Sequence, residues 1–321
     1  MITSWASPKR STIVTAAALA AAVALLVVGA FADLGLSRAV VNPVSWWGNF
    51  GADYGETPGF LLIALSLATL AAAIWRLPSA AGRSSGGPSP GGGSPGGGGA
   101  FALSADAMTG GRGGGVGTPH GAVRTVLAVL ATLGIIALGA YAWAGVMRSF
   151  APQLGDGPTL VTALVISTVA SLAATRLPVR LLLAVRGPAL AVAVVAVLNP
   201  LLIVQLVKHL WGRIRFRDLA ADYGDFTPWF LPQGPTGNRS FPSGHAAMGW
   251  MFLPVLFATV WRGGGTGASS TLRRLVVTAI IVWGVFVAAS RVVVGAHYLS
   301  DVAFSTATAI ALSFVVCRMF C

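Results

Sequence analysis

Residues 275–301 have the sequence LVVTAIIVWGVFVAASRVVVGAHYLSD, in which an uncharged apolar run leads directly into a short polar motif. The run, 275–290, has the composition of a membrane-spanning helix and most of the required length. The motif that follows carries Arg291, His297 and Asp301. Ionisable side chains in or beside a membrane are energetically costly, and they usually mark a functional site. The stretch therefore predicts a membrane helix with a functional site at its end.

The composition of the whole chain indicates a membrane protein as well. Of its 321 residues, 55% are hydrophobic and only 9% are charged, whereas a soluble domain carries about 25% charged residues. We therefore predict an all-α fold, a polytopic membrane helix bundle of about eight transmembrane helices. The candidate spans are 12–32, 58–75, 124–147, 158–175, 187–207, 244–261, 275–290 and 302–317.

The net charge of the chain is explained by its place in a membrane. The formal charge of +12 comes from 21 Lys and Arg against 9 Asp and Glu. In a soluble protein this excess would indicate a nucleic-acid partner. Here most basic residues lie in short loops between apolar runs, where they set membrane orientation. We therefore expect contact with membrane lipids and no nucleic-acid partner, and the sequence leaves protein partners open.

The loop charges also predict an orientation. With eight spans, nearly all basic loops fall on one side, which the positive-inside rule makes cytoplasmic, with both termini on that side of the plasma membrane. The opposite loops carry the acidic residues Asp33, Asp53, Glu56 and Asp156. The loop 208–243 breaks the rule because it places Lys208 and four arginines outside. Positive charge on this face predicts a bound anion.

Residues 78–122 differ from the rest of the chain, since they consist largely of Gly, Ser and Pro. Such a segment cannot bury a core and is typical of a flexible, disordered linker, here on the cytoplasmic side. A Gly-rich phosphate loop is the alternative, but it requires a strand-to-helix context that this tract lacks. The predicted organisation is therefore an N-terminal two-span segment at 1–77, the linker, and a six-span membrane domain at 123–321.

The motif after the seventh span contains a histidine and a carboxylate four residues apart. On a helix, His297 and Asp301 would share a face. A carboxylate there can hold one imidazole nitrogen as N–H, leave the other nitrogen free to attack, and stabilise positive charge on the ring. The guanidinium of Arg291 matches phosphate oxygens bidentately. The alternative is a surface arginine and a structural histidine near a helix start.

A second motif, FPSGH at 241–245, precedes the sixth span. Ser243 is a typical N-cap residue, and Gly244 follows it. A helix that begins here offers free backbone N–H groups to an anion. His245 would lie beside that anion and could protonate a leaving alkoxide. The alternative is an ordinary N-cap with an incidental histidine.

A third motif ends the fifth span and combines Lys208 with Arg215. The alternative to phosphate binding is a lysine that extends to the membrane surface at a helix end, with arginines as interfacial anchors. An outward-facing basic loop favours phosphate binding. The charge-based topology places all three motifs on the outer side of the membrane, so we expect them to form one site.

These motifs resemble those of the type 2 phosphatidic acid phosphatase (PAP2) superfamily, whose pattern is K-x6-R-P, then P-S-G-H, then S-R-x5-H-x3-D. The second and third parts are complete at 242–245 and 290–301, and the first is present except that Phe216 replaces the usual proline. This departure leaves both cations in place and puts the rigidity of the loop in doubt. The resemblance covers about 187–317, and it implies a PAP2-like core in the C-terminal half of the chain.

The resemblance implies metal-independent dephosphorylation of a lipid phosphate or diphosphate at the outer face of the membrane, without a cofactor. It makes His297 the nucleophile that forms a phosphohistidine, Asp301 its orienting carboxylate, and His245 the acid that protonates the leaving group. The residues implied for phosphate binding are Lys208, Arg215, Ser243, Gly244 and Arg291.

Three alternatives to a phosphatase are considered. A phosphotransferase would use the same site with an acceptor other than water. A vanadium haloperoxidase would hold vanadate there, but membrane embedding argues against it. A non-catalytic transporter or scaffold would not need His245, His297 and Asp301 together, and a transporter usually binds its substrate near the bilayer midplane, where this chain has few ionisable residues.

Overall fold

The computed structural model describes residues 8–77, 119–261 and 270–321 of the chain. Within these ranges the structure is helical with connecting loops and contains no strand, which confirms the predicted all-α bundle. The helices are α1 (Pro8–Val40), α2 (Trp46–Tyr54), α3 (Thr57–Arg76), α4 (Pro119–Phe150), α5 (Asp156–Ala174), α6 (Val179–Ala196), η2 (Val197–Ile203), α7 (Val204–Trp211), η3 (Phe216–Asp218), α8 (Gly244–Gly249), α9 (Leu253–Trp261), α10 (Ser270–Val293) and α11 (Leu299–Phe320).

In the described part of the chain, seven helical segments are long and apolar enough to cross a membrane. The predicted span at 244–261 is instead a shorter apolar segment, broken into α8 and α9. The break precedes Pro254, which has no N–H to continue the helical ladder. Leu253 N–H bonds Trp250 O at 3.0 Å, a tighter turn than an α-helix makes. About eight spans were predicted, and the structure has seven plus this broken one.

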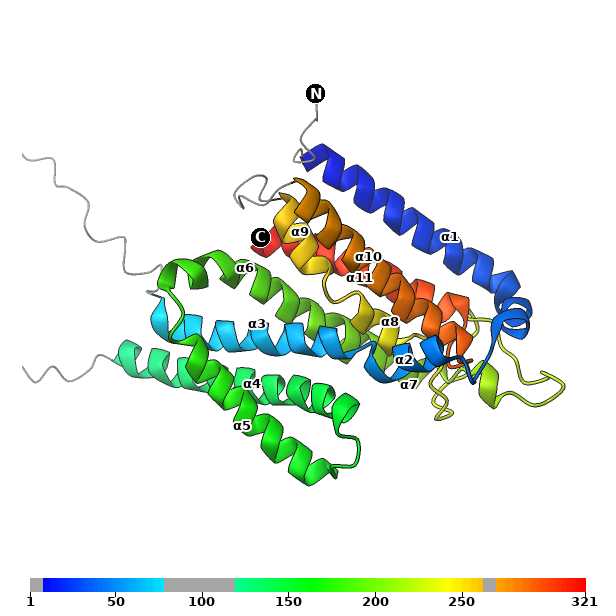
Figure 1. The fold of residues 1–321 in the computed structure, drawn as a ribbon, viewed down its shortest axis with the longest axis horizontal. Helices are drawn as coiled ribbons and strands as arrows, with labels where there is room; N and C mark the ends of the chain where they lie inside the picture. The colour runs from blue at the N-terminus through cyan, green and yellow to red at the C-terminus, as the bar shows by residue number, and fades with distance from the viewer. Residues whose placement is uncertain (1–7, 78–118, 262–269) are drawn as a thin grey trace, which may run out of the picture.

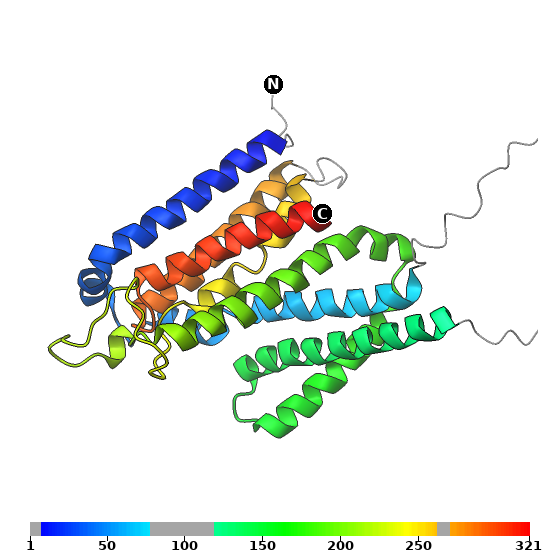
Figure 2. The ribbon, with the colours of Figure 1, turned by 180° about the vertical axis from the view of Figure 1, so that it is seen from behind.

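The bundle has two parts that meet along α3 and α6 (Figures 1 and 2). On one side, α1 packs along α11, and α10 packs on α2 and α8. On the other side, α4 and α5 form a hairpin that packs on α3. Small side chains such as Ala64 and Ala191 are buried in the core between α3 and α6, where they allow close approach of the helices.

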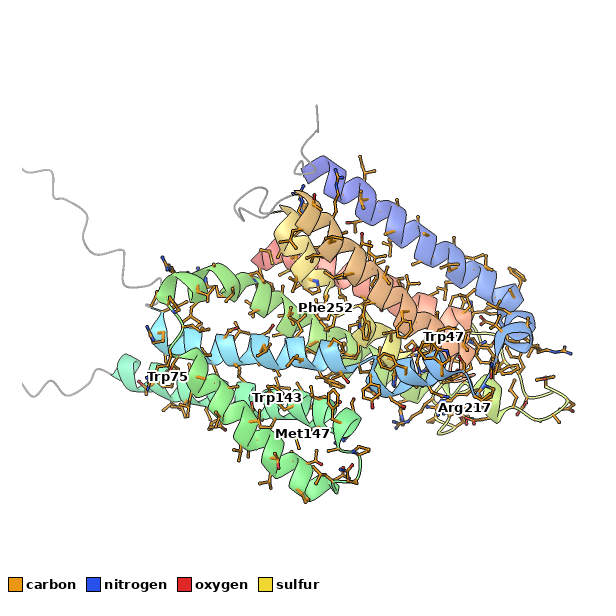
Figure 3. All side chains as sticks on the ribbon, in the orientation of Figure 1. Trp47, Trp75, Trp143, Met147, Arg217 and Phe252 are labelled. Carbon is orange, nitrogen blue, oxygen red and sulfur yellow. The ribbon has the colours of Figure 1, made fainter. Side chains whose placement is uncertain are left out.

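The ends of the helices fall into two groups, one at each end of the bundle (Figure 1). The start of α1, the end of α3, the start of α4 and the end of α11 lie at one end. The other end holds α2, the end of α7, η3, the start of α8, the end of α10 and the start of α11. In Figure 3, Trp47 and Arg217 mark this second end, while Trp75 lies at the first. All three predicted motifs are therefore at the same end of the bundle.

The predicted linker at 78–122 lies outside the described residues, except for 119–122, which begin α4. The helices α6, η2 and α7 follow one another without a break and lead to the first motif. The middle segment, η2, is π-helical and contains Pro200. Val204 N–H bonds Asn199 O, five residues back, because a proline in the helix interrupts the ordinary i to i−4 ladder. This wider turn forms part of the wall of a cavity beside the site, described below.

Candidate active site

The first motif is positioned by a glycine that ends α7. Gly212 has φ +61°, the left-handed conformation of a helix C-cap. A Cβ at this position would lie 2.1 Å from Gly234 O, so no other residue fits without moving the backbone. The turn sends Arg213 into the protein interior and leaves Lys208 on the last turn of α7.

Arg213 is fully buried and forms the centre of an ion-pair network. Its Nη1 lies 2.6 Å from Asp301 Oδ1, and its Nη2 lies 2.9 Å from Asp33 Oδ2 on α1. Its Nε donates to Thr227 O at 2.9 Å, and the guanidinium lies over the ring of Tyr298, 3.9 Å from the centroid. Buried charges are tolerated only when paired in this way. Arg213 therefore neutralises two buried carboxylates and has no free edge for a substrate.

His297 is 2% exposed, and its ring orientation is fixed at Nδ1. Nδ1 lies 2.6 Å from Ser240 O and 3.5 Å from Asp301 Oδ2. A carbonyl oxygen only accepts, so Nδ1 carries the hydrogen and Nε2 keeps its lone pair. Burial lowers the pKa of His297 to about 4, although the negative charge of Asp301 acts in the opposite direction. The imidazole is therefore neutral at pH 7, as a nucleophile must be.

Ser240 connects all three motifs, a role that no sequence pattern indicates. Its carbonyl accepts from His297, its Oγ donates to Asp301 Oδ2 at 2.6 Å, and its N–H donates to Arg213 O at 3.0 Å. Asp301 also accepts from Tyr298 N–H at 2.9 Å, which caps the start of α11. The Asp301 carboxylate thus fixes the backbone around His297 and lies at ion-pair distance from the His297 imidazole.

The second motif forms the start of the short helix α8, as predicted. Ser243 is its N-cap, and its Oγ accepts from Ala246 N–H at 3.3 Å. His245 follows in the first turn and is partly exposed. Its Nδ1 lies 3.0 Å from Glu56 Oε1, and its Nε2 lies 3.1 Å from Ala52 O.

The three predicted phosphate-binding cations interact electrostatically with the two histidines or with one another. The charges of Lys208 and Arg291 act on both His245 and His297, and Arg215 in turn acts on Lys208 and Arg291. A Cβ built on Gly244 would lie 3.8 Å from Lys208 Nζ, so the first and second motifs are in contact.

Two of these cations have buried donors without a partner. Among the described residues, no acceptor lies within hydrogen-bond distance of Arg215 Nε, Arg291 Nε or Arg291 Nη1. A buried unpaired donor is destabilising, so each such group in a folded protein requires an explanation. Asp301 cannot satisfy them because Arg213 already pairs with it. The arrangement fits an anion with several oxygens, such as a phosphoryl group.

The remaining aromatic residues of the 208–243 loop support the site from outside. Phe226 packs edge-on against Tyr298, with 5.5 Å between centroids, and Trp229 stacks on Phe241 at 6.0 Å. Phe230 is 49% exposed. Phe226 and Trp229 therefore pack against residues within the motifs.

The structure thus brings every sequence-predicted site residue to one end of the bundle, and it adds Arg213, Ser240, Asp33 and Glu56. Asp33 and Glu56 had been noted only as acidic loop residues. The signal that could have singled them out is a carboxylate next to an apolar span, which usually has a partner or a function. Among the described residues, no three His, Cys, Asp or Glu side chains lie together as metal ligands do, and metal-independent chemistry stays a prediction.

Comparison with protein families matches residues 189–320 to the PAP2 superfamily. This part of the chain is similar to that superfamily, as the motifs predicted, and it contains all eight predicted site residues. Asp33 and Glu56 lie outside the matched part. No curated protein and no solved structure matches the chain.

Proposed function

We propose that the protein is a phosphatase that hydrolyses a lipid phosphate or diphosphate through a phosphohistidine on His297. The observation that carries this proposal is the set of unpaired, buried guanidinium donors of Arg215 and Arg291 beside a neutral imidazole. The cations would bind the phosphoryl oxygens, and Nε2 of His297 would attack the phosphorus.

The proposed reaction has two balanced steps. In the first, His297 Nε2 forms a P–N bond as the P–O bond to the lipid alcohol breaks, and the leaving oxygen takes a proton from His245. In the second, water forms a P–O bond as the P–N bond breaks, and His245 takes the proton of the water. Lys208, Arg215 and Arg291 stabilise the charge on the equatorial oxygens in both transition states, with the Gly244 N–H and Ser243 beside them.

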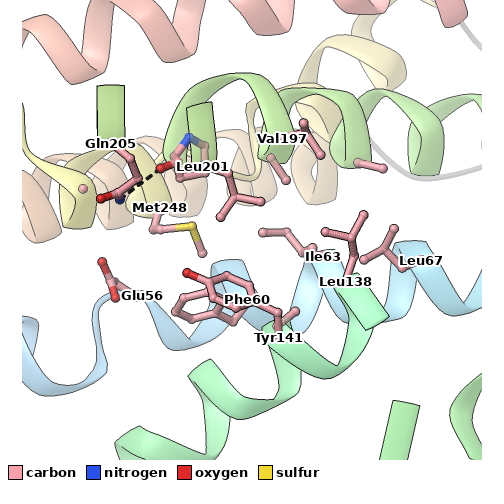
Figure 4. Close-up of a pocket in the computed structure, with 15 residues that line it drawn as sticks. Glu56, Phe60, Ile63, Leu67, Leu138, Tyr141, Val197, Leu201, Gln205 and Met248 are labelled. Carbon is pink, nitrogen blue, oxygen red and sulfur yellow. Dashed lines mark hydrogen bonds between the residues drawn. The ribbon is translucent and has the colours of Figure 1, made fainter. Parts of the chain in front are cut away.

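A cavity beside the site supports a lipid as the substrate. It has a volume of about 200 Å³ and lies between α3, α4 and η2 (Figure 4). Glu56 and Gly244 lie at its polar end, and the rest of its wall is mostly apolar, including Phe60, Ile63, Leu138, Val197 and Met248. An apolar cavity of about 150 Å³ already binds benzene. A cavity of this size suits a segment of a hydrocarbon chain whose phosphate lies at the histidines.

The distribution of charge supports an extracytoplasmic site in the plasma membrane. The end of the bundle that holds the motifs also holds the acidic residues Asp33, Asp53 and Glu56, while Arg76 and Arg318 lie at the ends of α3 and α11 on the opposite side. By the positive-inside rule, that opposite side faces the cytoplasm together with both termini.

The test of the proposed function is release of inorganic phosphate by the purified protein in detergent, from a panel of lipid monophosphates and diphosphates with EDTA present. Wild-type protein should release phosphate, and His297→Ala should release none. His209→Ala is the matched control, since His209 is an exposed histidine on α7 outside the site, and its activity should equal that of the wild type. A His297→Ala variant with wild-type turnover would rule out the proposal.

A phosphotransferase is the second candidate, and a larger cavity favours it. This cavity has a volume of about 560 Å³, has a more polar lining than the first, and shares Glu56, Phe60 and Tyr141 with it. It has room for an acceptor larger than water. Adding lipid and sugar alcohols to the assay separates the two activities, because a transferase would form a new phosphoester at the expense of free phosphate.

A further inference from the structure

The corner between α2 and α3 brings a carboxylate into the active site from outside the PAP2-matched part of the chain. Glu56 is the N-cap residue of α3, but its side chain makes no capping hydrogen bond. Its Oε1 instead lies 3.0 Å from Nδ1 of His245. We propose that Glu56 is a positioning residue that holds, together with His245, the proton delivered to the leaving group. This inference rests on the proposed phosphatase function.

Counting hydrogens around the His245 ring supports a shared proton. Nε2 faces the carbonyl oxygen of Ala52 at 3.1 Å, and a carbonyl only accepts, so this hydrogen bond requires N–H at Nε2. Nδ1 faces a carboxylate oxygen at hydrogen-bond distance, which requires a second hydrogen, either on the ring or on Glu56. The pair therefore holds one hydrogen more than neutral histidine and ionised glutamate would carry.

The surrounding charges explain why a carboxylate is needed. Burial, which is the largest effect, and the nearby charges of Arg291 on α10 and Lys208 on α7 all disfavour a proton on the His245 ring, and the two cations also act on Glu56. Without a compensating negative charge, these cations would repel a proton from the imidazole. Glu56 provides that charge at the position of His245 Nδ1.

The location of Glu56 identifies which proton is transferred. Its side chain lines the apolar cavity (Figure 4) and also the larger polar one. Because Glu56 Oε1 lies beside His245 Nδ1, this side of the pair is next to the space proposed for the substrate. The proton between Nδ1 and Glu56 would move to the leaving oxygen as the P–O bond breaks. Attack of water on the phosphohistidine would return one proton to the pair, so the cycle closes.

Dependence on the leaving group provides the test. We compare Glu56→Gln with wild type on two substrates, a long-chain alkyl phosphate and 4-nitrophenyl phosphate. The alkoxide is a poor leaving group and needs a proton, whereas 4-nitrophenolate leaves readily without one. For the variant, kcat/KM on the alkyl phosphate should fall by about tenfold or more, the scale of general acid catalysis. On 4-nitrophenyl phosphate it should change by less than about twofold.

Three further variants sharpen this test. His245→Gln should show the same selective loss of kcat/KM, which reports formation of the phosphohistidine and not its later hydrolysis. The double variant should be no worse than His245→Gln alone, because residues that act as one unit are not additive. Glu56→Asp keeps the carboxylate at a greater distance, so it should show a smaller loss that is again confined to the alkyl phosphate. Asp156→Asn, which removes an exposed carboxylate at the same end of the bundle, should leave both activities unchanged.

The outcomes distinguish failure of this inference from failure of the proposed function. Equal losses on both substrates would mean that Glu56 only supports the structure, and no loss on either would mean that it has no part in proton transfer. Either result overturns the inference and leaves the phosphatase intact. Wild-type protein that releases phosphate from neither substrate would overturn the proposed function and this inference with it. Retained activity on 4-nitrophenyl phosphate shows in the same preparation that each variant is folded.

Discussion

Arg213 Nη1 lies 2.6 Å from Asp301 Oδ1, and the two side chains are 1% and 0% exposed. Asp33 of α1 binds the other end of the same guanidinium. The proposed catalytic carboxylate is therefore tied to a helix outside the PAP2-matched part of the chain. This ion-pair network connects α1, the 208–243 loop and α11 at the site.

Replacing Arg213 with Met would leave two buried carboxylates without a counter-ion. We expect the free energy of unfolding to fall by about 3–5 kcal/mol, because breaking a buried ion pair on one side is strongly destabilising. Phosphatase activity should fall with it. Denaturant unfolding in detergent measures the effect, and Arg217→Met, at a half-exposed position, is the control. Equal stability of the two variants would contradict the account of this network.

The low pKa of His297 predicts activity at unusually acid pH. Protonation blocks the nucleophile, and burial lowers this pKa to about 4 from an ordinary value of 6.5. The phosphate of the substrate also titrates, so its ionisation is measured separately and the kcat/KM values are corrected for it. In the corrected pH profile, kcat/KM should fall on the acid side with a midpoint near pH 4. A limb near 6.5 that remains after this correction would contradict the burial seen for His297.

The same shift predicts how stability depends on pH. Between pH 6.5 and about 4 the unfolded chain binds a proton at His297 that the folded protein does not bind. The contribution of this residue to the free energy of unfolding should therefore decrease as pH falls through this window. Comparing wild type with His297→Gln by thermal unfolding at both ends of the window isolates this contribution, since the variant has no titrating group there.

Arg291→Lys keeps the charge but removes the planar guanidinium. If the unpaired donors of Arg291 bind phosphate, kcat/KM should fall by about 10²-fold, the effect of losing one transition-state donor. Stability should not fall, since the lost donors have no protein partner. Arg274→Lys, at the exposed start of α10, is the control for kinetics and unfolding. A large loss of stability with normal kinetics would indicate a structural role instead.

Filling the apolar cavity should select against long chains. Leu138 lies on its α4 wall, and Leu138→Trp should lower kcat/KM for a long-chain lipid phosphate by about tenfold, equivalent to about 1.4 kcal/mol of lost binding. Activity on 4-nitrophenyl phosphate should be unchanged. Leu133→Trp places the same side chain on an exposed position of α4 and should affect neither substrate. Equal effects of both variants would argue against chain binding in this cavity.

The parts of the site that could be predicted from sequence are those fixed by short-range geometry. The spacing of His297 and Asp301 and the N-cap position of Ser243 follow from local helix rules. The contacts of Arg213 with Asp33, and of His245 with Glu56, join positions almost two hundred residues apart in the chain. No local pattern specifies such a pair, because it depends on how α1 packs against α11 and how α3 packs against α8.

Two local expectations changed for physical reasons. The span at 244–261 is broken before Pro254, which hydropathy alone does not register. Phe216, which stands where the family usually has proline, stacks on Tyr223 with 5.7 Å between centroids and contacts Tyr298 edge-on at 6.4 Å. Aromatic packing therefore holds the loop after Arg215 where a proline ring would otherwise restrict it.

Trapping the covalent intermediate tests the central claim most directly. The protein would be mixed with a lipid phosphate labelled with ³²P and quenched in alkali, which preserves a P–N bond, and the labelled peptide would be sequenced. We predict label on His297 in wild type and none in His297→Ala, with normal labelling of His209→Ala. Rapid turnover without label on His297, or label on another residue, would contradict the phosphohistidine mechanism.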